Sequence, residues 1–167
     1  MLCRILYLFI ITALFIHPTS AQDWDYEFAI GARIGLAYGL NAKYFLRLHP
    51  ARQPHYALEG MITTRYNGVN GTILCAYHHE IFDTQGFNIY TGGGAHFAVW
   101  NSDEVDWETE KHGYNPYTGL DLIIGMEYVI TYLPISISLD WKPAVNFISD
   151  LNLMIDDIGL SVRYLFK

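Results

Sequence analysis

The chain has 167 residues, 10 basic against 17 acidic residues and a formal net charge of −7, which argues against nucleic acid as a partner. Its length allows one domain with a sizeable core. Aromatic residues make up 16% of the chain, a high share for a soluble domain, and Tyr and Trp favour membrane–water boundaries. The composition therefore favours a membrane protein.

The first segment in chain order, residues 1–21, has the features of a secretory signal peptide. A basic residue lies near its start, a mostly apolar run covers 5–16, and small residues at 19–21 form a cleavage site. The run is too short to span a bilayer as a helix. We expect a mature domain over residues 22–167, with Cys75 as its single cysteine and therefore no intramolecular disulfide.

After residue 22 the sequence alternates between apolar and polar residues, as ISISLDWK at 135–142 shows. A period of two is typical of a β-strand with unlike faces. Turn residues divide the chain into segments close to the length of a membrane-spanning strand. Asn67-Gly68 is the strongest turn, because this dipeptide suits a two-residue type I′ hairpin. The predicted strands are 26–36, 39–48, 55–66, 69–80, 87–99, 118–130, 134–146 and 157–166.

The two faces of these predicted strands differ in chemistry. Bulky apolar residues occupy one face of all eight, and Tyr or Trp recurs near strand ends, as an interfacial girdle requires. The other face carries charged and polar residues, with glycines that leave space for long side chains. An eight-stranded barrel is just wide enough for its own side chains to fill, and closure leaves no strand edge in lipid. We predict an all-β fold, a closed eight-stranded antiparallel transmembrane β-barrel with its apolar face toward lipid.

Five acidic and five basic residues on the polar face predict an ion network in the lumen. Buried charges must be matched, because an unpaired one costs several kcal/mol. The register extrapolated from the turns gives three pairs, which are Lys43 with Glu59, Lys142 with Asp121, and Asp140 with Arg163. The predicted network is Glu27, Arg33, Lys43, Glu59, Arg65, Asp121, Glu127, Asp140, Lys142 and Arg163. We expect these side chains to fill the lumen and leave no open channel.

Five segments of the chain read IGARIGLAYGLNAKYFL, YTGGGAHFAVW, GLDLIIGMEY, SLDWKPAVNF and SVRYLFK. They resemble a group of small Bacteroidetes-type outer-membrane β-barrels and, more broadly, the OmpX-like and OmpA-transmembrane class of the porin family. The resemblance implies an integral protein of the Gram-negative outer membrane, with both termini in the periplasm and the connection 100–117 facing outward. It also implies that Tyr164 and Phe166 form the assembly signal that the barrel-assembly machinery reads, although Lys167 follows the phenylalanine.

The outward connection 100–117 carries the candidate surface contacts. Its aromatic residues either make adhesive contacts, because exposed aromatics dominate recognition, or rest on lipid headgroups. Its clustered carboxylates suit a hard cation such as calcium, but their spacing fits no EF-hand, and a solvated acidic loop is the preferred interpretation. We predict no metal and no cofactor. The candidate contact residues are Trp100, Asp103, Glu104, Asp106, Trp107 and Tyr114.

His78 and His96 are the candidate catalytic residues, because both face the lumen on adjacent predicted strands. At about 3.3 Å per residue the register separates them by ~16 Å, too far for a shared metal or a proton relay. No serine lies beside a histidine at the outer rim, where enzymes of the resembling class place their chemistry. We therefore predict no catalytic site.

These inferences together predict a monomeric cell-envelope protein that contacts outer-membrane lipid and has a structural or surface-interaction role. An external partner would bind through 100–117, and the lumen would not be an open pore. Two alternatives stay open. One is an outer-membrane lipid-modifying enzyme of the lipid A deacylase or acyltransferase type. The other is a soluble periplasmic lipocalin-like carrier with the two faces exchanged.

Overall fold

The structure of the chain is a computed structural model that describes residues 26–46, 56–80, 86–105, 113–130, 132–148 and 151–166. Most of these residues lie in strands. The strands are β1 (Phe28–Gly35), β2 (Tyr38–Leu46), β3 (Tyr56–Arg65), β4 (Gly68–Glu80), β5 (Phe87–Asn101), β6 (Tyr114–Ile130), β7 (Ile135–Trp141), β8 (Ala144–Ile148), β9 (Asn152–Met154) and β10 (Ile158–Phe166), with a 3₁₀ turn, η1 (Ser102–Glu104), after β5. Across these ranges no helix has the length and apolar character needed to cross a membrane.

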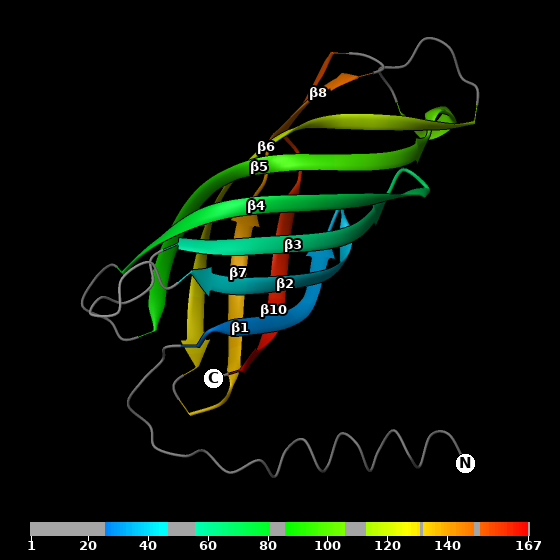
Figure 1. Ribbon diagram of the computed structural model, residues 1–167. Helices are drawn as coiled ribbons and strands as arrows, with labels where there is room; N and C mark the ends of the chain where they lie inside the picture. Colours follow the sequence, from blue (N-terminus) through cyan, green and yellow to red (C-terminus); the bar gives the residue numbers. More distant parts are fainter. Residues whose placement is uncertain are drawn as a thin grey trace, which may run out of the picture.

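The strands pair antiparallel around a closed ring (Figure 1). The pairings run in the order β5-β4-β3-β2-β1-β10-β7-β6, and β5 pairs with β6 to complete the circle. Beyond β7, β6 continues its pairing with β8, and β8 pairs with β9. The barrel therefore has eight wall positions. One of them is shared by β7 and β8 in succession, and another by β9 and β10. The predicted closed eight-stranded antiparallel barrel is confirmed.

The predicted strand 134–146 is interrupted, because β7 ends at Trp141 and β8 begins at Ala144. Pro143, in the gap, has no N–H to donate to a neighbouring strand, and its carbonyl accepts a hydrogen bond from Leu122 at 2.9 Å. A second difference is β9, which forms inside the stretch that the sequence predicts to be a loop.

The hairpin between β3 and β4 lies one residue earlier than predicted. Arg65 pairs with Gly68, so Tyr66 and Asn67 are the two turn residues. Both have positive φ, 50° and 52°, as a type I′ turn requires. Gly68 instead begins β4, where a Cβ would overlap the backbone of Val99 on β5. The predicted turn type is therefore correct, and the glycine serves the close approach of two strands.

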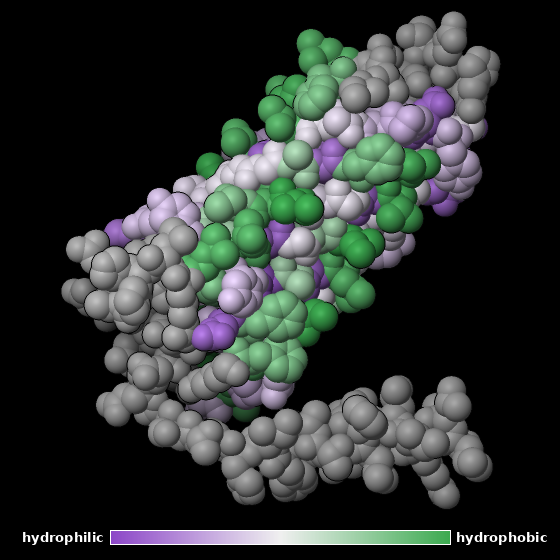
Figure 2. Space-filling view, viewed as in Figure 1, coloured by the Kyte–Doolittle hydropathy of each residue, from purple (hydrophilic) through white to green (hydrophobic). Residues whose placement is uncertain are grey.

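The apolar face lies on the outside of the barrel and the polar face on the inside. Figure 2 shows apolar side chains spread over the wall that faces the viewer. Ile73 is 70% exposed and Ile62 66% exposed, whereas Lys43 and Arg163 are fully buried. A soluble barrel would show the reverse, because charged side chains are almost never fully buried unless paired. The alternation in the sequence predicts this arrangement.

One end of the barrel carries the hairpin turns 36–37 and 66–67 and η1, and we call that end the mouth. Below the mouth, two apolar clusters interrupt the polar interior. Near the opposite end, where β10 finishes, lie Tyr26, Ala29, Phe45, Ala57, Val129 and Leu165. Nearer the middle lie Met61, Leu74, Ala76, Tyr90 and Ile123. The interior is therefore a packed core with embedded charges.

Candidate functional site

Four charged side chains meet in the half of the lumen away from the mouth, and we call them the terminal-side cluster. Arg163 of β10 contacts Glu59 of β3, and its Nη1 lies 3.5 Å from Glu127 Oε1. Lys43 Nζ lies 3.2 Å from Glu127 Oε2 and 4.0 Å from Glu59 Oε2. All four side chains are buried. Two cations therefore face two carboxylates, and the charges of this cluster match.

Hydroxyl groups add hydrogen bonds to the terminal-side cluster. Tyr26 donates to Glu127 Oε2 at 3.0 Å, and Ser136 donates to Glu127 Oε1 at 2.9 Å. Arg163 Nη1 donates to Ser138 at 2.6 Å. Buried charges need such bonds in addition to their ion pairs, because each oxygen and N–H has lost its water. Ion pairs and hydrogen bonds together hold the cluster, in which Glu59 Oε2 has no hydrogen-bond partner among the described atoms.

A second group of charges lies closer to the mouth, and we call it the mouth-side cluster. Arg33 on β1 binds Asp140 at 2.7 Å through Nη2 and Asp157 at 2.9 Å through Nη1. Lys142 Nζ lies 2.8 Å from Asp121 Oδ1 and 3.3 Å from Asp157 Oδ2. In this cluster two cations face three carboxylates, so these five side chains have one more formal negative charge than positive charges.

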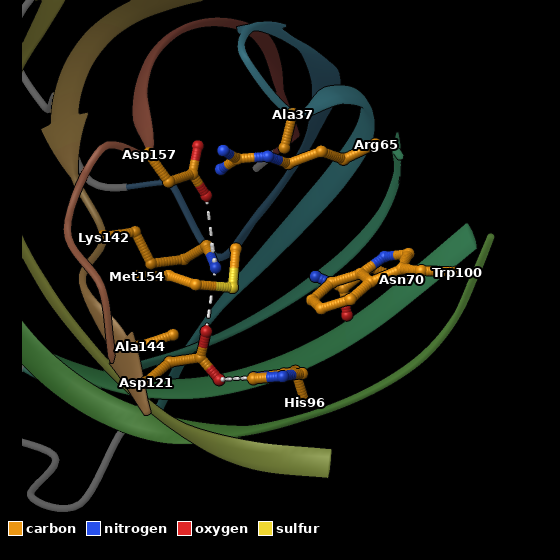
Figure 3. Close-up of a pocket in the computed structure, with 10 residues that line it drawn as sticks. All are labelled: Ala37, Arg65, Asn70, His96, Trp100, Asp121, Lys142, Ala144, Met154 and Asp157. Carbon is orange, nitrogen blue, oxygen red and sulfur yellow. Dashed lines mark hydrogen bonds and ion pairs between the residues drawn. The ribbon is translucent and has the colours of Figure 1, made fainter. Parts of the chain in front are cut away.

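His96 on β5 lies beside this excess of carboxylates (Figure 3). Its Nδ1 is 2.7 Å from Asp121 Oδ2, and its Nε2 is 2.8 Å from Asn146 Oδ1. Both ring nitrogens of His96 therefore face oxygen atoms of neighbouring side chains.

The register prediction is correct for two of its three ion pairs. Lys43 stands directly opposite Glu59, and Lys142 contacts Asp121. The pairing of Asp140 with Arg163 is wrong. The residue opposite Asp140 on β10 is Gly159, four positions before Arg163.

Arg33 from β1 fills the space beside Gly159. A Cβ on Gly159 would overlap the guanidinium of Arg33, so the glycine is what lets this arginine reach Asp140. Asp140 therefore finds its cation on a strand that is not its neighbour. The long Arg33 side chain passes over β10 at Gly159 and replaces the cross-strand contact that the register predicts.

Two predicted members of the lumen network lie elsewhere. Arg65 extends from the end of β3 to Asp156 at the mouth, with Nη2 2.6 Å from Oδ2. Glu27 is half-buried just before β1, and its backbone pairs with Phe166 and Phe45.

Sequence reasoning also missed members of the clusters. Tyr90 and Asp157 both contact them. Tyr90 shares the polar face with Asn88 and His96 and could have been found by its parity. Asp157 lies in a stretch of the chain without alternation.

Below the mouth an aromatic group covers His96. Trp100 stacks on Tyr117 at a centroid distance of 5.0 Å and on His96 at 6.0 Å. Trp100 is 1% exposed, so its predicted role as a surface contact is wrong. The reason is that β5 and β6 continue as a paired hairpin to Asn101 and Tyr114, which keeps the alternation and points Trp100 inward.

The other predicted contact residues of 100–117 are placed as follows. Asp103 and Glu104 are exposed on η1, and Tyr114 is exposed at the start of β6. Asp106 and Trp107 lie outside the described residues. At the opposite end of the barrel the predicted assembly-signal residues Tyr164 and Phe166 form an edge-to-face ring pair in β10.

A small cavity remains between the mouth-side cluster and the mouth (Figure 3). Its interior space is about 10 Å³, which is the space that one water molecule needs. The lining residues are Ala37, Arg65, Asn70, His96, Trp100, Asp121, Lys142, Ala144, Met154 and Asp157. Among the described atoms, Arg65 Nη1 and Asn70 Oδ1 are buried without a hydrogen-bond partner. The cavity therefore offers a donor and an acceptor to water.

The two candidate histidines are not brought together. His96 pairs with Thr72, six positions before His78 on β4, which is about 20 Å at about 3.3 Å per residue. His78 packs between the rings of Phe45 and Tyr90. Within the described ranges, no group of three or more His, Cys, Asp or Glu side chains is placed to hold a metal ion. Both nitrogens of His96 are already engaged, so the ring has no hydroxyl nucleophile to activate.

Comparison with models of known protein families gives no match, and comparison with curated proteins gives none either. Among solved structures, the chain is similar to the N-terminal β-barrel domain of Pseudomonas aeruginosa OprF. The TM-score is 0.62 at 15% sequence identity, and the match covers 85% of this chain and all of the other. At this identity the likeness shows the fold alone, a β-barrel like that of the OprF domain.

Proposed function

We propose that the protein is an integral outer-membrane β-barrel with a structural role, a lumen closed by charged side chains, and a surface at its mouth for contact with an external partner. The fold supports a structural role, because it is that of an outer-membrane-type barrel. The sequence segments that resemble small Bacteroidetes-type, OmpX-like outer-membrane barrels support the same role.

The observation that carries the proposal is the inverted arrangement of the two faces. Bulky apolar side chains are exposed over the outer wall, including Leu122 at 62% and Leu139 at 47%. Ion pairs such as Arg33 with Asp140 are enclosed within. In water this arrangement exposes the wrong surface, whereas in a bilayer the wall meets acyl chains and the eight wall positions pair their backbones around the ring. A lipocalin-like soluble carrier requires the opposite arrangement and is not favoured.

An enzymatic role is not favoured by the geometry of the lumen. A lipid A deacylase or acyltransferase of the kind considered needs a hydroxyl nucleophile within hydrogen-bond reach of a histidine. His96 contacts a carboxylate, an amide and an indole ring, and the hydroxyl of Thr72, opposite it on β4, has no hydrogen-bond partner among the described atoms. Lipid A mass spectra recorded with and without the gene test this directly, and an altered acyl pattern would favour the enzyme.

The contact surface at the mouth is proposed for the exposed part of the predicted connection. Tyr114 is 61% exposed, and Asp103 and Glu104 are exposed beside it on η1. An exposed aromatic ring next to carboxylates fits a partner with a basic or hydrogen-bonding surface. This role now rests on Tyr114 and the acidic turn, because Trp100 is enclosed in the barrel.

The test of membrane insertion is Leu139→Arg compared with Leu139→Met. Leu139 stands between Met126 and Leu160 on the apolar wall. A cation on the lipid face costs about 2–4 kcal/mol at the bilayer midplane, whereas Met keeps an apolar surface of the same size. We expect the arginine variant to lose urea-resistant membrane association and heat-modifiable migration on gels, and the methionine variant to keep both. Equal insertion of the two variants would refute the outward assignment of the wall.

A further inference from the structure

We propose that the free edge of β9 (Asn152–Met154) is a docking site for an extended peptide segment of an external partner protein, which adds to the barrel wall as one more strand. The site lies at the mouth, but it uses other residues than the contact surface proposed above. It therefore goes beyond the proposed function, and it rests on the barrel being folded in a membrane.

β9 pairs on one side only within the described part of the chain. Its partner is β8, in a register that sets Leu153 opposite Val145. The wall position on the other side belongs to β1, whose pairing with β10 ends at Gly35 and Gly159. β1 then turns back into β2, and no described strand occupies the wall position above this turn. β9 is therefore an edge strand on top of a barrel that is closed below it.

The backbone of Leu153 faces this free edge. The carbonyl of Val145 points toward Gly119 on β6, and the carbonyl of Pro143 accepts from Leu122 on the same strand. Val145 thus directs its hydrogen-bonding groups away from β9, so Val145 and Leu153 form a non-hydrogen-bonded pair. In such a pair both residues point their N–H and C=O groups outward. Leu153 therefore offers one donor and one acceptor to an incoming strand.

The free edge lies beyond the part of the wall that the hydrocarbon covers. A strand needs about 9–11 residues to cross it, and β1 has eight before its turn. The segment 153–166, which leads from β9 to the ring pair at the opposite end, is longer than that. Figure 1 shows β8, the partner of β9, at the mouth end of the barrel beyond the β1–β2 turn. Because an open strand edge is not tolerated in lipid, its place above the bilayer leaves it to water and to a partner.

The side chains beside the edge suit a strand with unlike faces. Leu151, Leu153 and Ile155 are 82%, 61% and 59% exposed. Met154, between two of them, is buried and lines the cavity below the mouth. Apolar side chains on neighbouring strands stabilise a sheet when they stand side by side. The geometry therefore fits a segment with an apolar residue at every second position, which covers the exposed leucines.

A second copy of the chain fits this edge less well. Two barrels in one membrane have the same orientation, so their β9 strands run in the same direction and would pair in parallel, which is the less stable arrangement. A separate segment is free to pair antiparallel and so to continue the ladder between β1 and β10. It would begin above the ion pair of Asp156 with Arg65. Extended peptides add to exposed sheet edges in this way.

The experiment compares Leu153→Pro with Leu153→Val in the full chain, folded in lipid nanodiscs. Proline lacks the N–H that faces the free edge, and an edge strand tolerates proline where this N–H is unpaired. Valine keeps the N–H and an apolar side chain. The probe is a soluble, fluorescein-labelled peptide in which valine and threonine alternate between terminal lysines. Its fluorescence anisotropy, measured against barrel concentration, gives the affinity.

We expect saturable binding of the peptide to the unaltered barrel and none to empty nanodiscs. Leu153→Pro should weaken the affinity by about tenfold or more, because it removes a backbone hydrogen bond and obstructs the edge. Leu153→Val should change the affinity by less than about twofold, since the backbone pairing is kept. Two N-methylated peptides test the unaltered barrel further. Methyl groups on the amides of one strand edge should abolish binding, and those on the other edge should leave it.

Four results would overturn the docking site: no saturable binding, equal binding to empty nanodiscs, equal affinities of Leu153→Pro and Leu153→Val, or equal effects of the two methylation patterns. Heat-modifiable migration of each sample shows that the barrel is folded. The test is therefore distinguishable from a test of the proposed function, because a folded, inserted barrel that does not bind the peptide refutes only the docking site.

Discussion

Arg163 shows what a single charged residue does in this lumen. Its guanidinium contacts Glu59 and Glu127 and donates to Ser138, and none of the side chain is exposed. The cost of taking such a charge out of water is several kcal/mol, and it is offset only when every partner is present. Each member of the terminal-side cluster is therefore sensitive to the loss of any other.

Arg163→Leu should lower the free energy of unfolding by about 3–5 kcal/mol, because it leaves Lys43 facing two carboxylates. Urea unfolding of the barrel in lipid or detergent, followed by tryptophan fluorescence, measures this change. The double variant Arg163→Leu with Glu59→Leu leaves one cation and one carboxylate and should recover most of the loss. A double variant no more stable than the single one would show that charge matching is not what stabilises the cluster.

At the residue scale the sequence predicts which charged side chains face the lumen better than it predicts which of them form ion pairs with one another. Parity along each strand identifies Arg33, Asp140 and Arg163 as inward-facing, because it depends only on the local backbone. The partner of each depends on how far a side chain reaches across the closed ring, and Asp140 consequently pairs with Arg33 and not with Arg163. Asp157 was missed because it follows a stretch without alternation.

At the scale of elements, glycines shape the strands to fit their long neighbours. Gly125 on β6 lies against the buried ring of Tyr90, and Gly119 lies against His96. The mid-strand glycines Gly92 and Gly94 permit close approach of β5 to the backbone of β4. The predicted role of inward glycines, to leave space for long side chains, agrees with Gly119 and Gly125.

Gly125→Ala should destabilise the barrel by about 1–3 kcal/mol, as overpacking of a filled core does. The added Cβ would lie 2.6 Å from the Tyr90 hydroxyl and 2.9 Å from the Leu139 carbonyl, which is closer than Cβ atoms come in real structures, and the Tyr90 ring is fully buried. Gly60→Ala on β3 is the matched control, since its Cβ meets nothing within 4 Å. Its effect should stay within about 0.5 kcal/mol. Urea midpoints compare the two, and equal shifts would contradict the space-filling role of Gly125.

Strand boundaries were predicted least well where pairing is not local. The type I′ turn at Tyr66-Asn67 lies one residue from the predicted position because Gly68 is required beside β5. The hairpin of β5 and β6 extends to Asn101 and Tyr114, beyond the ends that turn residues predict. Turn residues mark where a hairpin can end, but cross-strand pairing decides where it does end, and this pairing is not visible in the local sequence.

At the scale of the whole molecule, the packed lumen predicts an electrically closed barrel. The ion clusters and the apolar groups around Tyr26 and Met61 occupy the interior, and the cavity below the mouth is of about 10 Å³. Recordings in planar bilayers should show no stable conductance. Asp156→Asn, at the mouth, should not change this result, because the terminal-side cluster stays in place. A steady open level in either protein would contradict the closed lumen.

The sequence by itself determined the class of fold, the number of wall positions and the face of each strand. These follow from an alternation of two and from turn residues, which are properties of short segments. Only the tertiary structure decided which charges meet, that Trp100 is enclosed, and that Arg65 at the end of β3 contacts Asp156 just before β10. The physical reason is closure: once the ring forms, side chains from strands far apart in sequence share one narrow space, and their reach, not their register, selects the contacts.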